Sequence, residues 1–194
     1  MPQMKTFTQK IAFVLIFIFL ISSCGTKKTM PKVPKDEVVL NLPCTGPGFF
    51  SNASMFRATA IGESLDQMIA REKAFATARQ LLATNIESTM KIVIDNYAKS
   101  NEFNNTEEVL EKFEKIARTV VKRKLKRVSQ ICEQATKSSS TGNYKYYIAV
   151  ETSVDEIESD LLNTLSQDQS LQVDYNYEKF KDTFEKEMNT LSGK

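Results

Sequence analysis

A regular stripe of small side chains is the feature that most constrains how this 194-residue chain can fold. Ala70, Ala74 and Ala78 recur at four-residue spacing within a predicted helix over residues 64–97. Residues four apart share one face of a helix, and small side chains there let the helix lie close to a sheet. Larger apolar residues extend the same face, namely Leu65, Leu81, Leu82, Ile86, Met90, Val93 and Tyr97. The pattern therefore predicts a long helix packed on a sheet.

The other elements are predicted from caps, breakers and periodicity. Ser64, with Gln67 three residues later, forms a capping box that predicts the first turn of the long helix. A second capping box, Ser153 with Glu156, predicts a helix to about residue 165. The remaining predicted helices are one that follows the loop and N-cap at 104–108 and ends in the basic run 122–127, and a last one over 177–191. The predicted strands are 38–42, 56–61, 128–136 and 144–152, the last two joined as a hairpin.

The first 23 residues are expected to be a lipoprotein signal peptide rather than part of the fold. Two lysines precede an apolar run over 11–21, which is too short to span a bilayer. The run ends in the sequence ISSCG at 21–25, which resembles a bacterial lipobox. Cys24 is therefore the predicted lipidation site, and its acyl chains are the predicted membrane anchor. The alternative is an ordinary secretory signal followed by a chance cysteine.

Removal of the signal leaves a chain without net charge. Two of the 26 basic residues lie in the signal, so 24 remain against 24 acidic ones, and no global field attracts nucleic acid. Residues 24–36 then form a lipidated tether that contains several lysines and prolines. The acidic residues that mark surface export in some lipoprotein systems are missing directly after Cys24. The expected location is the outer membrane, with the protein facing the periplasm.

Three stretches of the chain resemble one known family. They are the sequence FRATAIGES at 56–64, the helix with Ala70, Ala74, Ala78, Arg79 and Leu82, and the sequence GNYKYYIAV at 142–150. Together they resemble the Lpp-twenty type of bacterial membrane-associated lipoproteins, a group similar to the TNF-alpha-inducing proteins and to the N-terminal domain of flagellar assembly protein T. The resemblance covers residues 55–152 and implies a strand, two helices and a hairpin, with helices on one face of an antiparallel sheet. It carries over no catalytic residues.

Patterning and resemblance together predict an α+β fold: a small antiparallel sheet with helices on one face and a C-terminal helical extension. The expected segments are a lipoprotein signal peptide (1–23), a lipidated tether (24–36), an α+β lipoprotein domain (37–153) and the helical extension (154–194). Cys44 and Cys132 remain once Cys24 is lipidated, and their spacing matches no zinc motif. In an oxidising periplasm we expect them to form a disulfide, and two free buried thiols are the alternative.

The residue types exclude several kinds of chemistry. The chain has no histidine, which removes Ser/His and Cys/His catalysis and every histidine-ligated metal site. The acids between 155 and 160 lack the spacing of a calcium loop, and no glycine-rich phosphate loop is present. We therefore expect no catalytic, cofactor or metal site.

One candidate contact patch remains, the basic run of Lys122, Arg123, Lys124, Lys126 and Arg127. It is suited to phosphate-rich lipid or peptidoglycan, but the favoured interpretation is a solvated helix end, where cations stabilise the last carbonyl groups. The expected function is non-enzymatic binding or assembly at the outer membrane, through a protein partner or a second copy and not through nucleic acid. The alternatives are a host-directed effector and an enzyme that acts on cell-wall glycans with two acids about 5 to 9.5 Å apart in a cleft.

Overall fold

The computed structural model of the chain describes residues 34–100, 106–171 and 175–191. The predicted signal peptide, most of the tether and part of the loop at 104–108 lie outside these ranges. Residues 41–194 form one compact unit, and the residues before Asn41 belong to another. The strand expected at 38–42 is wrong, because these residues have no strand partner among the described ranges, and Val38 and Leu40 are 83% and 74% exposed.

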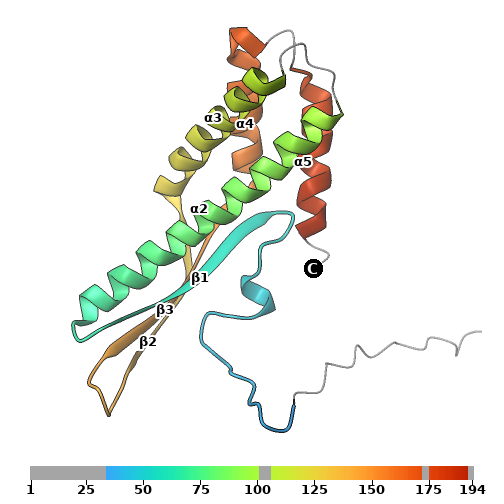
Figure 1. The fold of residues 1–194 in the computed structure, drawn as a ribbon. Coiled ribbons are helices and arrows are strands. Elements are labelled where there is room, and N and C mark those ends of the chain that lie inside the picture. Colours follow the sequence, from blue (N-terminus) through green and yellow to red (C-terminus); the bar gives the residue numbers. More distant parts are fainter. Residues whose placement is uncertain (1–33, 101–105, 172–174, 192–194) are drawn as a thin grey trace, which may run out of the picture. The chain divides into compact units, whose positions relative to one another are not determined.

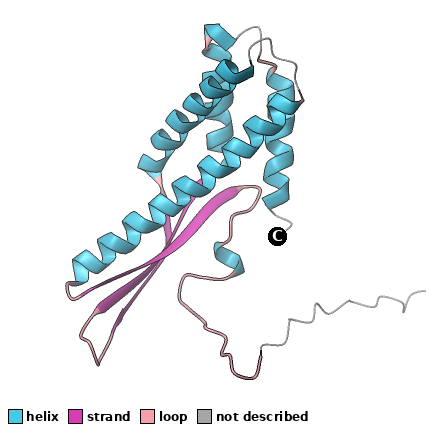
Figure 2. Cartoon of the chain, in the orientation of Figure 1, coloured by secondary structure: helices cyan, strands magenta, loops and turns pink. Residues whose placement is uncertain are grey.

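The compact unit is built on a three-stranded antiparallel sheet with the order β1-β3-β2. The strands are β1 (Met55–Ser64), β2 (Ser129–Lys137) and β3 (Tyr144–Ser153), so the three other predicted strands are confirmed. Central β3 buries Tyr146, Ile148 and Val150 on its helix-covered face. Figure 2 shows one long helix along this sheet and the other long helices beyond its upper end, and this combination of strands and helices confirms the α+β class.

Among the described residues, four α-helices complete the unit: α2 (Gln67–Lys99), α3 (Thr106–Lys124), α4 (Val154–Gln167) and α5 (Tyr177–Leu191). The first half of α2 packs on β1 and β3, and its second half extends beyond the sheet, where α3 and α5 pack on it (Figure 1). Helix α4 in turn contacts α3 and α5. Within the expected C-terminal helical extension, α5 thus packs on the long helix, whereas α4 contacts α3, α5 and strand β3.

Aromatic rings fill the core between these helices. The ring of Tyr97 lies 5.5 Å from that of Phe113 and 5.0 Å from that of Phe180, measured between centroids. The hydroxyl of Tyr97 also accepts a hydrogen bond of 2.8 Å from the main-chain nitrogen of Asn176, at the start of α5. This one residue therefore joins the end of α2 to both α3 and α5.

The start of α2 differs from the sequence prediction in its cap. The N-cap is Asp66, whose Oδ1 accepts a hydrogen bond of 2.9 Å from the nitrogen of Ile69. Ser64 is still part of β1, and its hydroxyl accepts from the nitrogen of Asp66 in the turn between the two elements. A carboxylate is as good a cap as a hydroxyl, so sequence alone did not distinguish the two positions. The other predicted cap is confirmed, because Ser153 accepts from the nitrogen of Glu156.

The contact between β1 and α2 is unusually close at Gly62. Ala70 and Ala74 are fully buried opposite this glycine. A β-carbon added to Gly62 would collide with the carbonyl oxygen of Ala70 and the main-chain nitrogen of Ala74. Gly62 is therefore required by the helix that crosses it, and the alanine stripe has the role that its spacing predicts.

We expect Gly62→Ala to lower the free energy of unfolding by about 3 kcal/mol, because the added methyl group meets main-chain atoms that cannot rotate away. Urea denaturation measures the change. Gly48→Ala is the matched control, since nothing lies within 4 Å of a β-carbon there. Equal stability of the two variants would contradict the close packing of β1 on α2.

Candidate functional site

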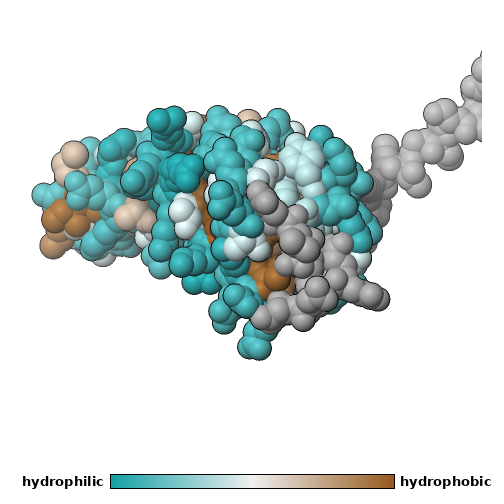
Figure 3. All heavy atoms as spheres, turned by 90° about the horizontal axis from the view of Figure 1, so that it is seen from above, coloured by the Kyte–Doolittle hydropathy of each residue, from teal (hydrophilic) through white to brown (hydrophobic). Residues whose placement is uncertain are grey.

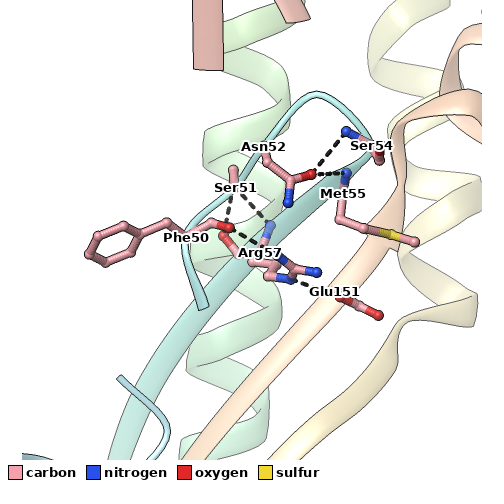
Figure 4. Close-up of polar contacts among 7 residues, drawn as sticks. All are labelled: Phe50, Ser51, Asn52, Ser54, Met55, Arg57 and Glu151. Carbon is pink, nitrogen blue, oxygen red and sulfur yellow. Dashed lines mark hydrogen bonds and ion pairs between the residues drawn. The ribbon is translucent and has the colours of Figure 1, made fainter. Parts of the chain in front are cut away.

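The outer edge of β1 is covered along part of its length by the loop that precedes it (Figure 4). The hydroxyl of Ser51 accepts from the nitrogen of Arg57 at 2.9 Å and donates to its carbonyl oxygen at 3.2 Å. The main chain of Asn52 donates to the carbonyl oxygen of Met55, and its side chain accepts from the nitrogen of Met55, both at 2.9 Å. These side chains take the place of a neighbouring strand, which is one way in which proteins protect an open edge.

An ion pair holds this loop in position. Arg57 Nε lies 2.8 Å from a carboxylate oxygen of Glu151, its register partner on β3, and both side chains are about four-fifths buried. Arg57 also donates to the carbonyl oxygen of Phe50 at 3.2 Å. The loop is therefore fastened to the sheet at the position where it covers the edge.

Beyond Arg57 the edge is open. Main-chain groups along a strand point alternately towards each neighbour, and those of Met55 and Arg57 point away from β3. The register between β1 and β3 is continuous, so the main-chain groups of Thr59 and Ile61 point outwards too. Among the described residues, no hydrogen bond reaches them from the edge side. Thr59 and Ile61 thus offer unpaired main-chain donors and acceptors along this edge.

A groove of about 320 Å³ lies along this open edge. One wall is the side of α2, with Thr77 and Leu81, and the other wall is the segment Pro43–Thr45. Ile61 and Leu81 are 48% and 43% exposed, so the groove presents large apolar side chains to solvent. An open strand edge between two walls is the geometry that accepts an extended peptide as an added strand.

The second wall is fixed by the two cysteines. Cys44 and Cys132 form a disulfide with a Cα–Cα distance of 5.6 Å. Cys132 lies on β2 in register with Ala149, which is fully buried. The segment around Cys44 is thus tied to the far strand of the sheet while it borders Thr59 and Ile61 of β1.

The residues of the basic run lie in two different environments. Lys124 ends α3 and lies 3.3 Å from a carboxylate oxygen of Glu156 and 3.2 Å from one of Asp160, with its side chain 16% exposed. The charge of Lys124 is therefore neutralised by ion pairs within the protein. Lys122, Arg123, Lys126 and Arg127 are exposed.

Acidic side chains gather in another cleft, of about 260 Å³, between α4 and α5. It is lined by Asp155 and Glu158 of α4 and by Glu185 of α5. Burial raises the pKa of Glu158 above its ordinary value, and the neighbouring charge of Glu185 adds to this effect. One carboxylate oxygen of Glu158 is buried and receives no hydrogen bond from the residues that the structure describes. Sequence analysis missed this cleft because α5 contributes Glu185 from a distant part of the chain.

The remaining surface features are simpler. A cavity of about 400 Å³ between α2 and α3 is lined by both apolar and charged side chains, and among the charged ones Lys91 pairs with Glu114 at 3.0 Å. Figure 3 shows an apolar patch at the left end of a mainly hydrophilic surface, over the start of α2. There Leu65, Met68 and Ile69 are exposed.

The ranges that the structure describes, 34–100, 106–171 and 175–191, contain neither a metal site nor a membrane-spanning helix. There, no group of three or more cysteine or acidic side chains could hold a metal ion. No helix in these ranges combines the length and apolar character that crossing a lipid bilayer requires. Comparisons with protein-family models, with curated proteins and with solved structures find no match to this chain.

Loss of the disulfide is expected to cost about 4 kcal/mol of unfolding free energy, because the bond joins residues 88 positions apart and restricts the unfolded chain. The variant with Cys44→Ala and Cys132→Ala, compared with the native chain by urea denaturation, measures this cost. Intact-mass analysis after alkylation checks the bond itself. Two alkylated thiols in the unreduced, denatured protein would show that the bond is not formed.

Glu158→Gln is expected to raise the melting temperature at pH 7. Because burial raises the pKa of Glu158 in the folded state, its charged form destabilises the fold above that pKa. The gain should shrink as the pH falls and vanish below the ordinary pKa of 4.5, where the group is protonated both folded and unfolded. Thermal melts from pH 3 to 8 measure it, with the exposed Glu111→Gln as control. A gain that persists at pH 3 would contradict this account.

Proposed function

We propose that this chain is a non-enzymatic, lipid-anchored envelope protein that acts by binding or assembly at the outer membrane. The observation that carries the proposal is the open edge of β1 at Thr59 and Ile61, with its apolar groove. A strand edge with unpaired main-chain groups beside exposed apolar side chains is a hazard for a protein, unless a partner uses it. A polypeptide bound there would pair with the main-chain groups and would also cover the apolar side chains.

The location rests on the sequence. The lipobox at 21–25 makes Cys24 the proposed anchor, and residues 25–36 separate this cysteine from the fold. The resemblance to the Lpp-twenty type of lipoproteins supports the same location. A disulfide between Cys44 and Cys132 fits an oxidising compartment, in line with a protein that faces the periplasm.

A second candidate is favoured by the cleft between α4 and α5. It holds three carboxylates, and the raised pKa of Glu158 is typical of a general acid. An enzyme that cleaves cell-wall glycans needs such a pair of acids. If this candidate is right, the purified protein releases soluble fragments from peptidoglycan and Glu158→Gln abolishes the release, whereas the binding proposal expects no release from either protein.

The anchor is tested with labelled palmitate in intact cells. The native chain should incorporate the label, and Cys24→Ser should not. A native chain that remains unlabelled would overturn the lipid anchor, whatever its binding properties.

The groove is tested with a photo-cross-linking amino acid placed at Ile61 in the full-length protein. We expect cross-linked products of higher mass in intact cells, because Ile61 faces the bound partner. Ile92 is a matched control position, since it is the same residue type, 50% exposed, on the outer surface of α2 away from the groove. Equal products from the two positions would contradict binding at the edge of β1.

A further inference from the structure

We propose that the groove along β1 receives the segment Val38–Leu42 of a second copy of this chain as an added β-strand. This inference rests on the proposed function and names the partner of that site. Each copy has one groove and one such segment, so the contact links copies head to tail.

The groove defines what its occupant must be. The unpaired main-chain groups of Thr59 and Ile61 require a partner that presents donors and acceptors at strand spacing. The walls formed by Leu81 on one side and by Pro43–Thr45 on the other require apolar side chains on both faces of that partner. A groove with a wall on each side has more room for one strand than for the edge of a second sheet that carries its own helices. The occupant is therefore a single extended apolar strand.

The segment Val38–Leu42 has these properties. It has the sequence VVLNL, in which four of five residues are large and apolar and two are β-branched, a composition typical of strands. Val38, Val39 and Leu40 are 83%, 67% and 74% exposed. Among the described residues no hydrogen bond reaches the main chain of these three, and the carbonyl oxygen of Leu42 accepts one from the Thr45 hydroxyl.

Chain connectivity favours a second copy as the donor. Pro43 directly follows the segment and itself lines the groove, and Cys44 is fixed by its disulfide. Because the residues that directly follow the segment are held in the wall of the groove, we expect the segment to pair with the groove of another molecule rather than with its own. In addition, the stretch 24–37 reaches about 45 Å when extended, so copies anchored in one membrane can meet.

Head-to-tail contact has a consequence for size. An interface formed by two different surfaces does not close after two copies unless the geometry allows it, and it gives rings or open chains. Oligomers larger than a dimer are therefore expected as the surface density of the protein rises.

The test uses two differently tagged, lipidated full-length chains expressed together. One carries Val39→Cys and the other carries Ile61→Cys, and a short bismaleimide is added to intact cells without reductant. We expect a product that carries both tags, at least tenfold more abundant than with Ile92→Cys as the control partner. A product no more abundant than the control would overturn the inference.

A second variant tests the donor segment. Leu40→Asp places a charge in the proposed strand and should reduce the doubly tagged product at least tenfold. Phe50→Asp is the matched control, because Phe50 is a 59% exposed apolar residue outside both surfaces, and it should leave the product unchanged. Since Leu40 is mostly exposed, neither variant should alter the melting temperature by more than about 2 °C.

The outcomes separate this inference from the proposed function. If a chain with both Val39→Cys and Ile61→Cys cross-links only within itself, or if the photo-cross-linker at Ile61 captures only other proteins, the second copy is excluded. In the latter case binding at the groove still stands. If Ile61 captures nothing beyond the control, both the inference and the binding proposal fail.

Discussion

The close approach of β1 and α2 at Gly62 is the contact on which the rest of the structure depends. Because Ala70 and Ala74 present almost no side chain, the helix lies directly over the strand. This fixes the direction in which α2 leaves the sheet, and its second half becomes the support on which α3 and α5 pack. The sheet and the helical core are thus joined by one continuous helix rather than by a loop.

The open edge is a product of the same geometry. The side of α2 forms one wall of the groove through Thr77 and Leu81, so the position of the helix decides what the edge of β1 can accept. The preceding loop protects Met55 and Arg57 with side-chain hydrogen bonds, and this protection stops before Thr59. The loop thus covers the edge of β1 at Met55 and Arg57 and leaves the edge at Thr59 and Ile61 open to a partner.

Much of the fold could be predicted from the sequence because its elements are strongly periodic. The alanine stripe, the Ser153 cap and the apolar face of α5 all predicted elements that the structure contains. The strand at 38–42 was predicted wrongly, because β-propensity reports a side-chain preference and says nothing about whether a neighbouring strand exists. The start of α2 was placed two residues early, since Asp66 competes with Ser64 as a cap.

The candidate sites were less accessible to sequence reasoning. The groove combines residues from α2, β1 and the segment at 43–45, and the acidic cleft combines Glu158 with Glu185. No local pattern connects such distant positions, and only the packing of the elements brings them together. The unpaired main-chain groups of Thr59 and Ile61 leave no mark in the sequence, because main-chain atoms are the same in every residue.

The disulfide gives the groove a dependence on chemical surroundings. The wall at Pro43–Thr45 is held across the sheet by the bond between Cys44 and Cys132. In a reducing compartment this wall is held against the sheet only by non-covalent contacts. The wall formed by α2 then stays fixed, whereas the wall at Pro43–Thr45 is no longer cross-linked to β2. The two-walled groove is completed by oxidation, and a newly made chain cannot present it in final form before it reaches an environment that oxidises thiols. The proposed assembly is thereby tied to the oxidation of Cys44 and Cys132.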